Sequence, residues 1–159
     1  MKNENGILII NKPSGITSHD VVSKVRKIFG TKKVGHVGTL DPLASGVLVV
    51  LINDATKIAQ FLENDSKTYK GTICFGLSTD SYDIDGKVLC EQNCEITEDE
   101  IDKCLATFIG QNEQLPPMYS AVKIEGKKLY EYARKDIKIE VPSRTVMINR
   151  LERISEVYK

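Results

Sequence analysis

The stretch GHVGTLDPLASGVLVVLI, residues 35–52, joins a glycine-rich loop to a continuous apolar run. Residues 46–52 predict a buried β-strand, because the run is rich in β-branched residues and far shorter than the ~18 residues of a membrane-spanning helix. The loop before it holds His36 and Asp41, with three glycines and Pro42. Glycine permits positive φ and close backbone approach, and proline stiffens the chain. The pattern predicts a rigidly positioned acid, base or nucleophile at Asp41; an ordinary Asp-Pro turn is an equal alternative.

The flanking sequence predicts an α+β fold. A short strand over Gly6–Asn11 ends at a turn, and a helix capped by Thr17 or Ser18 follows and stops at Gly30. A capping box at residues 97–100 opens another helix, closed by Gly110, with Cys104 on its apolar face. Further expected elements are strands over Thr68–Phe75, Ala121–Ile124, Ile137–Val141 and Val146–Ser155, and helices over Ala55–Leu62 and Leu129–Arg134. Without strict βαβ alternation, we expect a mixed, largely antiparallel sheet flanked by helices.

The composition is that of one globular domain: 159 residues, 41% hydrophobic and 28% charged. The N-terminus carries no signal-peptide pattern, so we expect a cytoplasmic protein without a membrane segment. Four cysteines are expected as reduced thiols, and the two histidines lie far from them in sequence. No metal site is therefore predicted.

The zero net charge conceals an uneven distribution. Residues 1–60 hold eight basic and four acidic side chains, residues 61–110 four and eleven, and residues 111–159 ten and seven. Two basic ends could form a positive face for a polyanion, although a solvated surface explains the same counts. Lys24, Arg26, Lys27, Lys32 and Lys33 cluster around the end of the first helix, where cations are favourable for local reasons.

Tyr69 is a second candidate functional residue, because Lys67 and Lys70 flank it. An aromatic ring between cations suits stacking on a nucleic-acid base with phosphates on either side. A half-buried strand tyrosine is the alternative. Nucleotide-binding and hydrolase motifs are missing from the sequence, so a nucleotide cofactor has no support.

Four ordered motifs resemble the TruB-type tRNA pseudouridine-55 synthase family. Residues 35–46 resemble its catalytic motif, and NKPSGITS at 11–18 resembles its N-terminal motif. Lys67-Thr68-Tyr69 occupies the tyrosine segment, and residues 114–134 resemble a later block, QLPPMYSAVK followed by GKKLYEYAR. The resemblance covers residues 6–142 and implies the pseudouridine-synthase-like catalytic fold.

The resemblance implies roles for these residues in isomerising uridine to pseudouridine in the T-loop of tRNA. Asp41 would act at the glycosidic centre, Tyr69 would stack on the base and accept the C5 proton, and His36 would help to hold the flipped nucleotide. Lys12 and Pro13 would form the wall behind the aspartate. The remaining substrate-binding candidates are Gly38, Thr39, Leu40, Lys67, Lys123, Lys127, Lys128 and Arg134. No metal or organic cofactor is implied, and the partner would be the T-arm stem-loop of tRNA.

The resemblance also implies that residues 1–159 are part of a catalytic domain. Family members carry a later Lys-Gly-Thr-Tyr-Ile-Arg type segment, whose arginine pairs with the aspartate, and a PUA-like RNA-binding domain; neither pattern is found in this sequence. We therefore expect residues 1–159 alone to be poorly active, and the full-length protein to be monomeric. A non-catalytic tRNA-binding or tRNA-folding module is the alternative function.

Overall fold

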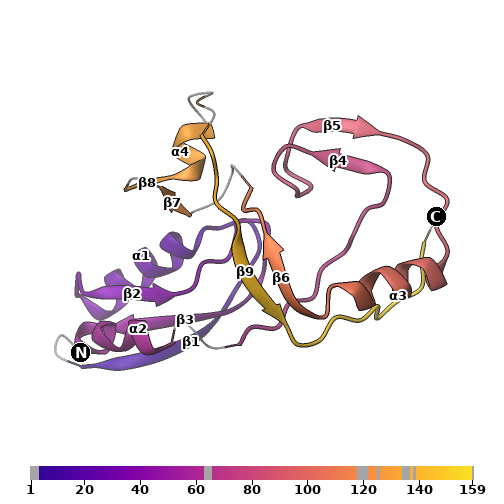
Figure 1. Ribbon diagram of the computed structural model, residues 1–159. Coiled ribbons are helices and arrows are strands. Elements are labelled where there is room, and N and C mark those ends of the chain that lie inside the picture. Colours follow the sequence, from indigo (N-terminus) through magenta and orange to yellow (C-terminus); the bar gives the residue numbers. More distant parts are fainter. Residues whose placement is uncertain are drawn as a thin grey trace. The chain divides into compact units, whose positions relative to one another are not determined.

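The computed structural model describes residues 4–62, 66–117, 122–124, 126–133, 137 and 139–158. The chain divides into two compact units, residues 1–70 and residues 71–159 (Figure 1).

Unit 1 is a three-stranded antiparallel sheet covered by one helix. The strands β1 (Gly6–Lys12), β2 (Val34–Val37) and β3 (Gly46–Ile52) lie in the order β1-β3-β2. Helix α1 (Ser18–Phe29) connects β1 to β2. A 3-10 helix η1 (Asn53–Ile58) and the short helix α2 (Ala59–Leu62) follow β3.

Local signals set both ends of α1, as the sequence predicts. Thr17 is the N-cap and forms a capping box with Asp20, which satisfies backbone donors that the first turn leaves unpaired. Gly30 is the C-cap in the left-handed conformation, with φ of 63°. Two hydrogen bonds from Thr17 hold the pKa of the Asp20 carboxyl below its usual value. The bond from the side-chain hydroxyl has the larger effect, and the bond from the backbone N–H has the smaller one.

The core of unit 1 lies between α1 and one face of the sheet. It contains Val21, Val22 and Val25 of α1 with Val34 of β2 and alternate residues of β3, namely Leu48, Val50 and Ile52. Leu8 and Ile10 of β1 pack against it, while Ile7 and Ile9 are exposed. This alternation of buried and exposed residues follows from the period of two along a strand. Most of the buried hydrophobic side chains in the described chain lie in unit 1.

The described residues of unit 2 form two-stranded antiparallel sheets and two helices. Its strand pairs are β4 (Leu77–Thr79) with β5 (Val88–Glu91), β6 (Gly110–Gln114) with β9 (Arg144–Ile148), and β7 (Lys123–Ile124) with β8 (Lys127–Lys128), all antiparallel. The helices are α3 (Glu98–Thr107) and α4 (Leu129–Ala133). Among the described residues of unit 2, the buried hydrophobic side chains are Ile101 and Leu129.

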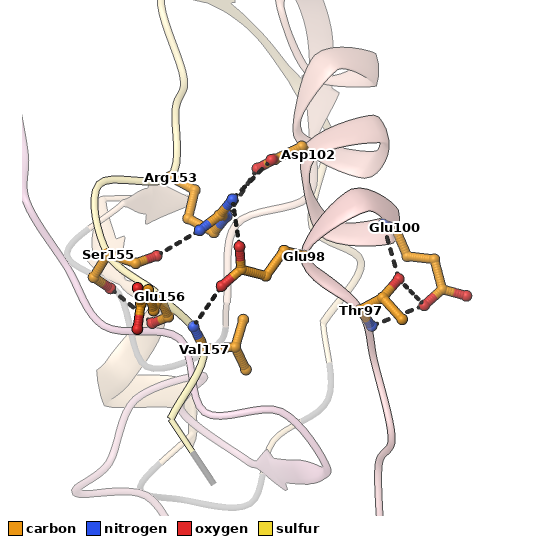
Figure 2. A network of polar contacts seen from close by, with 8 residues as sticks. All are labelled: Thr97, Glu98, Glu100, Asp102, Arg153, Ser155, Glu156 and Val157. Carbon is orange, nitrogen blue, oxygen red and sulfur yellow. Dashed lines mark hydrogen bonds and ion pairs between the residues drawn. The ribbon is translucent and has the colours of Figure 1, made fainter.

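A polar cluster ties the C-terminal segment of unit 2 to α3 (Figure 2). The guanidinium of Arg153 donates to both carboxylate oxygens of Asp102 at 3.0 Å, and lies 3.0 Å from a carboxylate oxygen of Glu98. The backbone N–H of Val157 donates to the other oxygen of Glu98 at 3.2 Å. The hydrogen bond from Arg153 lowers the pKa of the Asp102 carboxyl.

The α+β fold class is confirmed, with antiparallel pairing in every strand ladder of the described residues. The strand predicted over Thr68–Phe75 is wrong: residues 66–75 are exposed, and no described strand pairs with them. Residues 137 and 139–141 likewise form no strand. A segment of the chain forms a β-strand only where a neighbouring strand pairs with its backbone N–H and C=O groups.

Several predicted boundaries shift. The helix expected over Ala55–Leu62 divides into η1 and α2, and the strand from Val146 is β9, which ends at Ile148. Helix α3 begins at its predicted capping box but ends at Thr107 rather than at Gly110. Cys104, predicted to be in the core, is exposed, because little packs against α3 beyond Ile101. Ala121 and Arg134 lie outside the described residues.

Candidate active site

The sheet register brings the two N-terminal motifs together. Lys12, at the end of β1, is the register partner of Gly46, at the start of β3. The segment 12–18, which leads into α1, therefore lies beside the loop 38–45, which leads into β3. We call the second segment the aspartate loop, because it carries Asp41.

Lys12 is fully buried and bonds only to backbone carbonyls. Its Nζ donates to the carbonyls of Ile16 at 2.7 Å, Pro13 at 3.0 Å and Pro42 at 3.4 Å. These three bonds use all three donors of an ammonium group. The side chain therefore joins the 12–18 segment to the aspartate loop from behind, while Pro13 itself is exposed.

Ser18 is a site residue whose role the sequence did not reveal. Its side chain is buried in the first turn of α1, and its Oγ accepts from the N–H of Leu40 at 3.0 Å and donates to the carbonyl of Leu40 at 3.1 Å. Both polar backbone atoms of Leu40, the residue directly before Asp41, are thus hydrogen-bonded to Ser18. A serine at a helix start predicts only a cap.

Two further hydrogen bonds hold the far side of the aspartate loop. The N–H of Gly15 donates to the carbonyl of Pro42 at 2.8 Å, and the hydroxyl of Ser14 donates to the carbonyl of Leu43 at 2.8 Å. A turn closes within the loop, because Ala44 N–H donates to the Asp41 carbonyl at 3.1 Å. The backbone on both sides of Asp41 is therefore anchored to the 12–18 segment.

The Asp41 side chain itself is exposed. Within the described part of the chain, its carboxylate has neither a hydrogen-bond donor nor a cationic partner. The loop thus presents a free carboxylate from an anchored backbone, the arrangement expected of a positioned reactive group. The exposed Thr39 lies in the same loop.

His36 lies on β2, where it is the register partner of Val50. Its Nδ1 is hydrogen-bonded to the carbonyl of Gly38, whose φ of +70° turns the chain back toward the ring. Because a carbonyl only accepts, Nδ1 carries the proton and Nε2 of the neutral ring is an acceptor. The ring is half-buried at the entrance to the aspartate loop.

Tyr69 is in unit 1 but is not tied to the aspartate loop. It lies outside any helix or strand, the residue is 74% exposed, and Lys67 and Lys70 are beside it in sequence. No hydrogen bond links Tyr69 to the loop among the residues that the structure describes.

The later basic candidates belong to unit 2. Lys123 and Lys128 are register partners in the β7–β8 hairpin, and Lys127 lies in the same hairpin with an exposed side chain. Arg134 lies outside the described residues. No three histidine, cysteine or acidic side chains gather into a metal-binding group within the described ranges, and no helix there is long and apolar enough to cross a membrane.

Comparisons with known proteins agree on one family. The model of the TruB family pseudouridylate synthase, N-terminal domain, matches residues 26–158. A tRNA pseudouridine synthase B of Bacillus pumilus is 56% identical over 151 residues, which are 94% of this chain and 49% of the relative. A protein of the same name from Alkaliphilus oremlandii is 53% identical over 155 residues, covering 98% of this chain and 52% of the relative.

Among solved structures, a crystal structure of a Cbf5-Nop10-Gar1 complex contains a chain that is 31% identical, with a TM-score of 0.50. The similarity covers 74% of this chain and 31% of that chain. The present chain spans about half the length of the curated relatives that it matches.

Proposed function

Because the chain belongs to the TruB family of pseudouridylate synthases, we propose that it is part of an enzyme that isomerises uridine to pseudouridine in the T-loop of tRNA, at position 55. The observation that carries the proposal is the free Asp41 carboxylate on a loop anchored by Lys12, Ser14, Gly15 and Ser18. The proposed substrate is the T-arm stem-loop, and the proposed location is the cytoplasm.

The reaction requires a group at the glycosidic centre. The bond from ribose C1′ to uracil N1 breaks, the base rotates, and a bond from C1′ to C5 forms; C5 loses a proton and N1 gains one. Asp41 is the proposed carboxylate, which forms a covalent intermediate or stabilises positive charge as the first bond breaks. An anchored loop lowers the cost of placing this group, because its position is fixed before the substrate binds.

Other residues of unit 1 are proposed to hold the base. A nucleotide flipped out of its loop loses stacking worth a few kcal/mol, and the acceptor Nε2 of His36 is placed to compensate by a hydrogen bond. Tyr69 is proposed to stack on the uracil and to accept the C5 proton. Gly38, Thr39 and Leu40 of the aspartate loop are proposed to contact the substrate, with Lys12 and Pro13 behind the loop.

Basic residues of both units are proposed to bind the phosphates of the RNA. The candidates are Lys123, Lys127, Lys128 and Arg134 in unit 2 and Lys67 in unit 1. The chain is proposed to be a partial catalytic domain, which is completed by an arginine that pairs with Asp41 and by a PUA-like domain. We propose that the complete protein is a monomer that uses neither metal nor organic cofactor.

One observation favours the alternative, a tRNA-binding or tRNA-folding module without chemistry. Within the described residues Asp41 lacks the cationic partner that the family resemblance implies.

Tritium release from a T-arm transcript labelled at uridine C5 distinguishes the two functions. We would assay this chain and a chimera in which it is followed by the C-terminal half of a curated relative, and measure hairpin binding by both. The proposal expects release by the chimera and little release by the chain alone. Binding without release by the chimera would select the non-catalytic module.

A further inference from the structure

The chain carries a second basic cluster, at the end of unit 1 where α1 terminates. We define this α1-terminal surface by Lys24, Arg26, Lys27, Lys32, Lys33 and Lys57. The structure gathers these residues from three segments: α1, the turn before β2, and η1. The N–H of Asn53 donates to the carbonyl of Lys33 at 2.7 Å, so η1 lies against that turn.

Cations outnumber carboxylates on this surface. Asp54 lies 3.0 Å from Lys57 and 3.9 Å from Lys33, and Glu4 is nearby because its carbonyl accepts from the Asn53 side chain. Lys24, Lys27 and Lys32 are exposed, and Lys27 and Lys32 have no ion-pair partner within the described residues. The surface therefore keeps an excess of positive charge.

Local stabilisation of the helix explains only part of this cluster. Arg26 and Lys27 lie in the last turn of α1, where cations interact favourably with the helix dipole, and Arg26 also donates to the Val34 carbonyl at 3.2 Å. Lys32, Lys33 and Lys57 lie outside the helix, so the helix dipole does not account for them. Lys33 and Lys57 share Asp54, which leaves a net positive charge that a polyanion could neutralise.

Helix α1 connects this surface to the aspartate loop. The helix begins at Ser18, which is bonded to Leu40 next to Asp41, and ends at Phe29 beside the basic turn. At 1.5 Å per residue, Lys24 lies about 9 Å and the end of the 12-residue helix about 18 Å along α1 from Ser18. A folded RNA whose loop reaches Asp41 therefore has its stem within range of the surface.

We infer that the α1-terminal surface binds backbone phosphates of the RNA stem that carries the target loop. The inference rests on the proposed function. Lysines bind phosphates as point charges. The contact therefore adds affinity and positions the RNA stem on the protein, but it does not distinguish one base sequence from another. Lys27 and Lys32 are the main contacts, because neither has an ion-pair partner within the described residues. Lys24, which lies one helical turn after Asp20 and interacts with that carboxylate, adds a third cation.

The test compares two variants of this chain that lose the same charge. The first is Lys24→Gln, Lys27→Gln and Lys32→Gln, and the matched control is Lys87→Gln, Lys103→Gln and Arg150→Gln in unit 2. Fluorescence anisotropy measures binding to a labelled T-arm hairpin and to a single-stranded oligonucleotide of its loop, at several salt concentrations. Circular dichroism verifies that both variants are folded.

We expect the first variant to bind the hairpin about tenfold more weakly, with a salt slope reduced by about 3, because each lost phosphate contact lowers that slope by about 1. Its affinity for the loop oligonucleotide and the hairpin affinity of the control should match those of the unmodified chain. Equal hairpin affinity and salt slope in both variants would overturn the inference and leave the proposed function standing. Failure of the unmodified chain to bind the hairpin would also overturn it, and tritium release by the chimera then decides the proposed function separately.

Discussion

Replacing Ser18 with alanine should release the aspartate loop from α1. The hydroxyl of Ser18 makes two hydrogen bonds, 3.0 and 3.1 Å long, to the N–H and the carbonyl of Leu40. Alanine keeps the helix but leaves both backbone groups without these partners. A hydrogen bond contributes about 0.5–1.5 kcal/mol, so Ser18→Ala should cost about 2 kcal/mol in total.

Hydrogen exchange of the Leu40 amide, followed by NMR, reports this change at the bond itself. A loss of about 2 kcal/mol corresponds to roughly 30-fold faster exchange. Urea unfolding of the same samples measures the effect on the stability of the chain. Ser23→Ala is the matched control, because Ser23 lies on the same helix, is half-buried and has no hydrogen bond from its side chain within the described residues. Unchanged exchange at Leu40 in Ser18→Ala, or an equal change in the control, would refute this account of how the loop is held.

Other predictions concern the cap of α1 and the conformation of the aspartate loop. Thr17→Ala should destabilise the chain by about 1 kcal/mol in urea unfolding, because it removes the N-cap side chain. The pKa of Asp20 is lowered in the folded state, so its stabilising effect is complete above the unfolded value of about 3.9 and is lost as the pH falls through the folded value. Thr17→Ala removes the main cause of that shift, so its stability should fall less steeply below about pH 4; an equally steep fall in both proteins would contradict the assignment. Gly38→Ala should cost about 1–2 kcal/mol in the same assay because of its positive φ, whereas Gly6→Ala, at a glycine without positive φ and with open space around its Cβ, should cost less; equal costs would refute the role of backbone strain.

The sequence predicted best those parts of unit 1 whose signals are local. The capping box at Thr17 and the glycine at position 30 define α1, and the apolar run from Gly46 defines β3, because each signal acts within a few residues. The candidate site was located from Asp41 and its neighbours for the same reason. Strands β1 and β3 were predicted, but β2 (Val34–Val37) was not, because the glycines around His36 indicated a loop.

The tertiary contacts of the site could not be predicted. Ser18 and Leu40 are 22 positions apart, and nothing in either residue type identifies the other as its partner. The burial of Lys12 was equally hidden, because lysine is almost never fully buried unless its charge has partners, here three carbonyls of the folded chain. The predicted strand at Thr68–Phe75, which spans the boundary between the two units, failed because alternation alone does not supply a neighbouring strand.

We propose that the aspartate loop presents Asp41 as the reactive carboxylate. Single-turnover tritium release by the chimera is compared with release by its Asp41→Asn variant. Asp99→Asn on the exposed face of α3 is the control for loss of an acidic group. We expect Asp41→Asn to abolish release while hairpin binding and folding are retained, and Asp99→Asn to leave release, binding and folding unchanged. Release by Asp41→Asn at the rate of the unmodified chimera would contradict this proposal.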